Sequence, residues 1–180
     1  MGLISQSNET AVGIDLFEDM QLANLDASGS GSKSAVLKNI EKYAPDSKFE
    51  LISANSFSLT EKIFIDGRLA RIFHIDGGHF KECVANDLHI SQLSLHLGGV
   101  IIVDDYWHSG FPEVQEAVNR YYRTSNNIKA VPFAVGKNKI SLAGHEIKDK
   151  LLSALKEKFP PQKTKSVKVL GYDAIRVDQH

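Results

Sequence analysis

Acidic side chains stand directly after three of the strands that this 180-residue sequence predicts. Asp15 ends the first apolar run, Asp76 ends the third, and Asp104 and Asp105 end the fourth. Ligands of parallel α/β sheets bind beyond the carboxyl ends of the strands, so these side chains are expected at the edge where a ligand would bind. The sequence therefore predicts a binding site rich in carboxylates.

Asp76, Asp104 and Asp105 are candidate metal ligands. Carboxylates brought together by adjacent strand ends repel one another unless a cation joins them. Oxygen ligands that leave positions for water and substrate suit Mg²⁺ or Mn²⁺ better than zinc. The alternative is that one aspartate caps a helix and another faces solvent, and the spacing leaves both interpretations open.

Asp15 and His79 are further candidates for ligand binding and catalysis. Asp15 has the position of an acidic residue that accepts hydrogen bonds from ribose hydroxyls, although it could equally cap the next segment. His79, at a predicted helix start, could act as a general base near neutral pH. His74 lies inside a predicted strand and is expected to be a core residue. The loop after the fourth strand is expected to cover the site with its ring side chains, Tyr106, Trp107 and His108.

The elements that position these residues alternate between strands and helices, which predicts a doubly wound, mostly parallel α/β sheet. A helix after residue 80 is expected to stop at a left-handed cap formed by Gly98 and Gly99. The final strands, around Gly171, predict an antiparallel hairpin. Strands are predicted at 11–17, 49–53, 71–76, 100–103, 130–135, 139–143, 167–170 and 174–177, and helices before Pro45, after residue 80, after Pro112 and before Pro160.

Composition restricts the class of protein. The 21 basic and 22 acidic residues nearly cancel, which argues against a general binder of nucleic acid or membrane surfaces. No apolar run approaches the roughly 20 residues that span a bilayer. A single cysteine, Cys83, fits a reducing cytoplasm. We expect one cytoplasmic domain over residues 1–180, with a polar arm at 1–10 and a helix-and-hairpin appendage at 144–180.

Two motifs resemble a known family. The segments IFHIDGGH (72–79) and LGGVIIVDDY (97–106) resemble class I S-adenosylmethionine-dependent methyltransferases, and among them the macrocin-type O-methyltransferases. The similarity extends to VGIDLFED (12–19) and VPFAVGKNK (131–139), so that it covers about residues 11–143. The resemblance implies a Rossmann-like methyltransferase fold, S-adenosylmethionine as methyl donor and a hydroxylated small molecule, such as a sugar or natural product, as substrate.

The resemblance also implies roles for individual residues. Asp15 would hold the ribose hydroxyls of the donor, Asn55 and Ser56 would approach its adenine, and Asp76 would lie beside it. In metal-dependent relatives the positions of Asp76, Asp104 and Asp105 bind Mg²⁺. The metal would fix a substrate hydroxyl for in-line methyl transfer. Macrocin-type relatives often carry an acidic base where Gly78 stands, so His79 is the expected proton acceptor in this chain.

One departure from the family opens a second hypothesis. The family begins with a strand, a glycine-rich turn and a helix before the segment equivalent to 11–15, whereas ten residues without a Gly-x-Gly turn precede that segment in this sequence. The first strand is therefore expected to be missing. A truncated or degenerate domain could act as a binding or oligomerising module, with another copy supplying the missing pairing. A different nucleotide-binding α/β enzyme is disfavoured, because no pyrophosphate-binding glycine loop is present.

Overall fold

The structure is a computed structural model that describes residues 8–17, 31–59 and 68–178. The chain forms two compact units, residues 1–59 and residues 60–180. Most of the predicted N-terminal arm lies outside the described residues. The single-domain prediction for residues 1–180 stays a prediction.

The first unit is built on a parallel pair of strands. β1 (Thr10–Asp15) pairs with β2 (Lys48–Ser53), and Asp15 lies opposite Ser53 at the carboxyl end of both strands. Parallel neighbours need a crossover connection, and the sequence predicted one between these two strands. Both strands are thus confirmed, and their ends lie at one edge.

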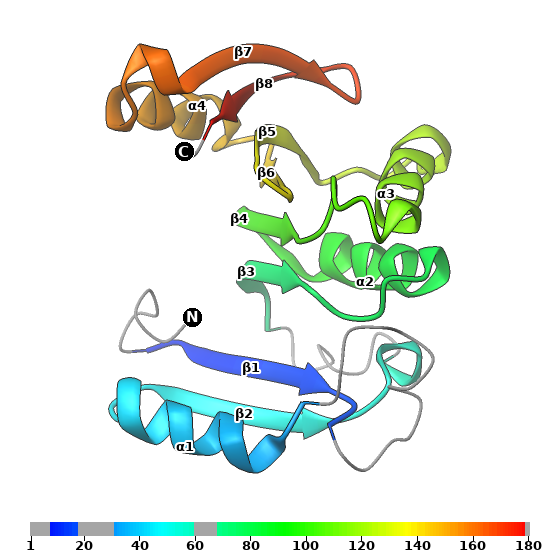
Figure 1. Cartoon of the computed structure of the whole chain (residues 1–180), viewed down its shortest axis with the longest axis vertical. Coiled ribbons are helices and arrows are strands. Elements are labelled where there is room, and N and C mark those ends of the chain that lie inside the picture. The colour runs from blue at the N-terminus through cyan, green and yellow to red at the C-terminus, as the bar shows by residue number, and fades with distance from the viewer. Residues whose placement is uncertain (1–7, 18–30, 60–67, 179–180) are drawn as a thin grey trace. The chain divides into compact units, whose positions relative to one another are not determined.

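A helix supplies this crossover. α1 (Lys33–Tyr43) lies beside the two strands (Figure 1). The Ser32 hydroxyl caps its first turn by accepting a hydrogen bond from the Ala35 amide at 3.3 Å. The helix ends before Pro45, as predicted. A short 3₁₀ turn, η3 (Ser56–Ser58), follows β2.

The second unit contains a mixed six-stranded sheet. Its spatial order is β3-β4-β6-β5-β8-β7 (Figure 1). The pairs β3–β4 and β5–β8 are parallel, and the other three neighbouring pairs are antiparallel. The predicted α/β class and the C-terminal hairpin, β7 with β8, are confirmed. The strands are β3 (Ala70–Ile75), β4 (Leu95–Val103), β5 (Ala130–Gly136), β6 (Lys139–Gly144), β7 (Thr164–Val169) and β8 (Tyr172–Val177).

Helices cover both faces of this sheet. α2 (Lys81–Ser94) and α3 (Pro112–Thr124) contribute to the larger apolar core, whereas α4 (Lys148–Lys158) packs against a separate cluster that includes Phe133 and Ala143. A strand buried on both faces needs consecutive apolar residues, which explains the uninterrupted β-branched run at the end of β4. A 3₁₀ turn, η5 (Pro161–Lys163), follows α4. No helix in the described ranges is both long and apolar enough to cross a membrane.

The predicted end of α2 is wrong. The helix stops at Ser94, and Leu95, which is 3% exposed, already pairs with Ala70 of β3. The next paired residues are Ile72 and Val100, so β4 carries an irregularity before its regular part. Among the described residues, Gly171 is the glycine with positive φ, so neither Gly98 nor Gly99 forms a left-handed cap.

Close packing explains Gly99 instead. A Cβ atom at this position would lie 2.6 Å from Cδ1 of Leu95 and 2.8 Å from the carbonyl oxygen of His96. Gly144 of neighbouring β6 is even more confined, since its Cβ would lie 2.1 Å from the Leu97 carbonyl oxygen. These glycines let the irregular start of β4 approach β6.

A buried glutamine joins α2 to the start of β5. Gln92 is 1% exposed, and its Oε1 accepts hydrogen bonds from the amides of Lys129 and Ala130 at 2.8 and 2.9 Å. Its Nε2 donates to the Ala130 carbonyl and to the Tyr122 hydroxyl at 3.2 and 3.3 Å. The Tyr122 hydroxyl in turn donates to the Ala130 carbonyl at 2.6 Å. These bonds satisfy polar groups that water cannot reach.

Tyr122 gives the fold a predictable response to alkaline pH. Burial raises the pKa of Tyr122 far above its ordinary value, so the folded chain keeps the proton where the unfolded chain releases it. Its contribution to stability is complete below about pH 10 and falls by up to about 1.4 kcal/mol per pH unit above it. Urea unfolding from about pH 8 to about pH 11.5 measures this slope. Because Tyr106 and Tyr121 also titrate, Tyr122→Phe is the comparison: its slope should be smaller, and equal slopes would refute the assignment.

Candidate functional site

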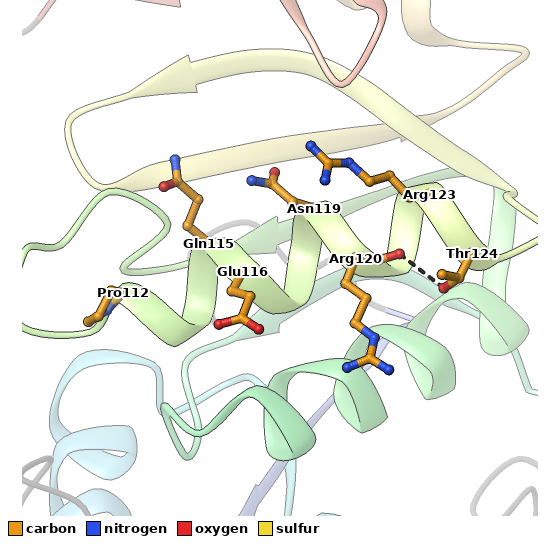
Figure 2. A pocket seen from close by; sticks show the side chains of 7 residues that line it. All are labelled: Pro112, Gln115, Glu116, Asn119, Arg120, Arg123 and Thr124. Atoms are coloured by element: carbon orange, nitrogen blue, oxygen red, sulfur yellow. Dashed lines mark hydrogen bonds between the residues drawn. The ribbon is translucent and has the colours of Figure 1, made fainter.

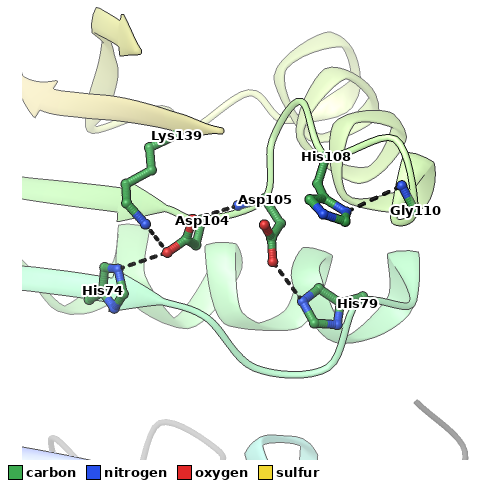
Figure 3. Close-up of polar contacts among 7 residues, drawn as sticks. All are labelled: His74, His79, Asp104, Asp105, His108, Gly110 and Lys139. Carbon is green, nitrogen blue, oxygen red and sulfur yellow. Dashed lines mark hydrogen bonds and ion pairs between the residues drawn. The ribbon is translucent and has the colours of Figure 1, made fainter. Parts of the chain in front are cut away.

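The carboxyl ends of β3 and β4 bring four of the predicted residues to one edge of the second unit. Ile75 pairs with Val103 in the parallel register, and the Asp104 amide donates to the Ile75 carbonyl at 2.9 Å. Asp76 and Asp104 therefore follow neighbouring strand ends, with Asp105 next in the chain. His79 belongs to the same edge through its contact with Asp105 (Figure 3).

Asp104 is held by three contacts. Its Oδ1 accepts a hydrogen bond from the Asp105 amide at 2.9 Å. Its Oδ2 forms an ion pair with Nζ of Lys139 and lies 3.6 Å from Nε2 of His74 (Figure 3). Lys139 reaches Asp104 from the first residue of β6, the antiparallel neighbour of β4. No role for Lys139 was predicted from the sequence. The hairpin of β5 and β6, together with the pairing of β6 with β4, places Lys139 beside the carboxyl end of β4.

The prediction that His74 is a core residue is wrong. Its side chain is 32% exposed, whereas the next residue, Ile75, is buried at 7%. Successive strand residues point to opposite faces, so the burial of Ile75 directs His74 away from the core. Partial burial lowers the pKa of His74, the charge of Asp76 opposes this, and the charge of Lys139 lowers the pKa further.

The His79 ring contacts Asp105 through its edge and Phe111 through its face. Its Nε2 lies 3.1 Å from Oδ2 of Asp105, and its side chain is 11% exposed. A carboxylate only accepts hydrogen bonds, so Nε2 is the donor in this contact. The ring of His79 stacks on Phe111 with centroids 3.7 Å apart and planes 8° from parallel.

Asp105 occupies an unusual backbone conformation. Its φ is 53°, in the left-handed region that Asp and Asn tolerate better than most residues. Such conformations cost about 1–3 kcal/mol and persist where the surroundings hold them, which happens often at functional sites. The contact with His79 and the Asp104 side-chain bond are two such restraints.

Donor atoms for a cation occur in two overlapping groups. Within the described part of the chain, ligand atoms of His74, Asp76 and Asp104 lie within 4.8 Å of one another, and so do those of Asp76, His79 and Asp105. Asp76 is common to both groups. Carboxylates fit the hard cation that the sequence analysis predicted, and each group adds an imidazole, which divalent transition metals also accept. The chemistry of the donor set therefore fits a divalent cation.

The predicted donor-binding residues of the first unit also share an edge. The Ala54 amide donates to the Asp15 carbonyl at 3.0 Å, which places Asn55 and Ser56 directly after the strand end beside Asp15. Oδ1 of Asp15 accepts a hydrogen bond from the Phe17 amide at 2.8 Å, so one carboxylate oxygen serves the capping role left open by the sequence. The side-chain oxygen of Asn55 likewise caps η3.

The expected aromatic cover over the site is only partly found. Tyr106 is 4% exposed and belongs to the core, so its prediction as an exposed loop residue is wrong. Its hydroxyl donates to Oδ1 of Asn119 at 3.1 Å, and burial raises its pKa while a hydrogen bond with Gln115 opposes the shift. Trp107 is 41% exposed, and the His108 ring stacks on Phe111 with centroids 4.8 Å apart.

A surface pocket of the second unit follows α3 and includes none of the predicted site residues (Figure 2). Its polar side chains come from successive turns of one helix, and none belongs to the ends of β3 or β4. The pocket is lined by Pro112, Gln115, Glu116, Asn119, Arg120, Arg123 and Thr124.

Strands with carboxylates at their carboxyl ends, joined to covering helices, define an α/β protein of the class that binds its ligands at this edge. A family model described as a methyltransferase domain matches residues 1–106, and the chain belongs to this family. No curated protein sequence matches it.

Eighteen chains of solved structures match the fold, with methyltransferases among them. The O-methyltransferase NovP has 20% sequence identity and a TM-score of 0.55 over 75% of this chain and 59% of its own. The apo form of CalS11, a TDP-rhamnose 3'-O-methyltransferase of calicheamicin biosynthesis, has 13% identity and a TM-score of 0.54 over 77% of this chain and 60% of its own.

MycE, solved with Mg, SAH and mycinamycin VI, has 12% identity and a TM-score of 0.50 over 75% of this chain and 44% of its own. The chain thus spans three fifths or less of the length of these proteins. The predicted Rossmann-like methyltransferase fold is confirmed.

Proposed function

We propose that this domain transfers a methyl group from S-adenosylmethionine to a hydroxyl oxygen of a small molecule, such as a sugar or natural product, with the help of Mg²⁺. The observation that carries the proposal is the gathering of Asp76, Asp104, Asp105 and His79 at the carboxyl ends of β3 and β4. Family membership supports the reaction class. The names of NovP and CalS11 support oxygen as the acceptor, and the MycE complex supports Mg²⁺.

The resemblance to the methyltransferase family supports four residues as the proposed donor-binding residues: Asp15, Asn55, Ser56 and Asp76. Asp15 would accept hydrogen bonds from the ribose hydroxyls, and Asn55 and Ser56 would approach the adenine. Oδ1 of Asp15 already serves the Phe17 amide, so Oδ2 is the oxygen assigned to the ribose. Asp76 is assigned to donor binding by the resemblance alone.

Asp76, Asp104 and Asp105 are the proposed metal ligands. When bound, Mg²⁺ would lower the pKa of the substrate hydroxyl and fix its orientation. His79 would take the hydroxyl proton. Asp105 would thereby have a second task, since it also contacts the ring of this base at Nε2. Lys139 balances the charge of Asp104 in the structure.

The proposal also covers the location of the protein in the cell and its partners. Near-neutral charge and a single cysteine support a cytoplasmic protein that works on small molecules rather than on nucleic acid or membranes. Association with a second copy remains part of the proposal, because sheet edges are natural pairing surfaces.

Calorimetry tests this proposal directly. Titration of the chain with S-adenosylmethionine and S-adenosylhomocysteine should give saturable heats, and methyl transfer to hydroxylated acceptors should require Mg²⁺. Absence of heat at millimolar ligand would exclude an active enzyme of this length and favour the binding or oligomerising module. Full activity in the presence of a chelator would refute the metal site alone.

Replacing Asp15 should weaken donor binding selectively. Asp15→Asn keeps an oxygen that can accept from the Phe17 amide but removes the charge offered to the ribose. We expect the dissociation constant for S-adenosylhomocysteine to rise about 10- to 100-fold, the range for one hydrogen-bonded charge. Asp46→Asn, an exposed aspartate of the same unit, is the control and should bind normally. Unchanged binding in Asp15→Asn would leave Asp15 with its capping role only.

A further inference from the structure

Phe111 is the residue whose ring lies against the face of His79. We propose that Phe111 is a positioning residue, which holds the His79 imidazole in the orientation needed to accept the substrate proton. The catalytic consequence rests on the proposed function, whereas the positioning itself can be measured without any reaction. No pattern in the sequence singles out Phe111.

Two contacts from different directions fix the His79 ring. Phe111 covers its face, with centroids 3.7 Å apart and planes 8° from parallel. Asp105 contacts its edge, with Nε2 and Oδ2 3.1 Å apart. The edge contact restrains one atom of the ring, and the stack restrains the plane of the ring. Together the two contacts restrain the orientation of the imidazole.

Phe111 is itself well anchored. Its amide donates to the His108 carbonyl at 3.1 Å, and its carbonyl accepts from the Val114 amide at 3.1 Å in the first turn of α3. Its side chain packs against the main apolar core. The His108 ring also stacks on it, with planes 27° apart. A ring held in this way can restrain a neighbour.

A second contact ties the His79 segment to the start of α3. Oε2 of Glu113 accepts a hydrogen bond from the Lys81 amide at 3.0 Å, at the first residue of α2. An acidic group is favoured there, since the first amides of a helix have no partners within the helix. The chain that follows His79 is thus restrained at the Lys81 amide.

The alternative is that Phe111 only fills volume in the core. A filler needs an apolar side chain of suitable size, so leucine would serve nearly as well, whereas the near-parallel stack needs an aromatic ring. Phe111→Leu and Phe111→Tyr therefore separate the two roles. Tyr121→Leu is the matched control, because Tyr121 lies on α3 and packs against the same core.

The experiment combines NMR with kinetics on the full chain. The His79 ring protons are assigned by their loss in His79→Gln, and the ring current of Phe111 should shift them upfield. Phe111→Leu should abolish this shift, Phe111→Tyr should restore it, and Tyr121→Leu should leave it intact. In the methyl-transfer assay, Phe111→Leu should lower kcat about tenfold with little change in KM, and Phe111→Tyr should recover most of the rate.

Identical His79 resonances in Phe111→Leu and the wild type would overturn the proposal. Equal losses of kcat in Phe111→Leu and Tyr121→Leu would also overturn it, since they would indicate a structural effect. If the wild type transfers no methyl group, the proposed function fails by itself, and the NMR comparison still decides whether Phe111 positions His79.

Discussion

Replacing Asp76 by asparagine should lower Mg²⁺-dependent methyl transfer by at least about a hundredfold. Asp76 belongs to both groups of candidate metal ligands, so its charge contributes to cation binding whichever group is used. Asparagine has the same shape but offers a neutral oxygen. The expected result is weak binding of the cation together with a low rate.

Asp76 is also the most selective position for this test. The side chain is exposed, and it has no hydrogen bond or ion pair in the described ranges 8–17, 31–59 and 68–178. Asp104 and Asp105, by contrast, hold Lys139 and His79 respectively, so substitutions there would disturb other side chains as well. The unfolding temperature of Asp76→Asn should therefore remain within a few degrees of the wild type.

Two measurements check this prediction. Mn²⁺ binding, followed by electron paramagnetic resonance, reports cation affinity without any substrate, and kcat/KM reports catalysis. Asp173→Asn, which removes an exposed carboxylate paired with Lys168, is the control and should behave as the wild type. Tight Mn²⁺ binding by Asp76→Asn would contradict the assignment of Asp76 as a ligand. A normal rate in the same variant would contradict its catalytic importance.

The sequence predicted the placement of Asp76, Asp104 and Asp105 because that placement is local. Each follows an apolar run, and parallel strands bring such ends to one edge. The same reasoning brought Asp15 and Asn55 together at the edge of the first unit. Alternation between strands and helices was sufficient for this part of the fold.

The unpredicted contacts depend on pairings between distant segments. Lys139 reaches Asp104 only because β6 lies antiparallel beside β4, an arrangement that a mostly parallel sheet did not anticipate. Phe111 reaches His79 across a loop with no periodic pattern. Tyr106 was assigned to an exposed loop by its position in the chain, but packing against the core buries it. Gly99 was read as a helix end, whereas the approach of neighbouring strands explains it.

Gln92 illustrates a residue whose importance only the packing reveals, and replacing it should have the largest effect on stability. Gln92→Leu keeps a similar volume but leaves the amides of Lys129 and Ala130 without the acceptor they have in the structure. Unpaired buried donors carry the full cost of desolvation. We expect the free energy of unfolding to fall by about 2–4 kcal/mol and the unfolding temperature by about 5–15 °C.

A comparison with Tyr122→Phe separates the hydrogen bonds of the Tyr122 hydroxyl from those that Oε1 of Gln92 accepts. That variant loses two hydrogen bonds of the hydroxyl, one donated to the Ala130 carbonyl and one accepted from Nε2 of Gln92. Nε2 still donates to the Ala130 carbonyl, so no buried acceptor is left unpaired. The loss should be about 1–2 kcal/mol, at a usual net value of about 1 kcal/mol for each hydrogen bond. Urea unfolding of both variants measures the difference. Equal losses would mean that the two hydrogen bonds accepted by Oε1 of Gln92 contribute little to stability. A clearly larger loss in Gln92→Leu would show that this side chain holds the start of β5 against α2, and through β5 the neighbouring hairpin strand that carries Lys139.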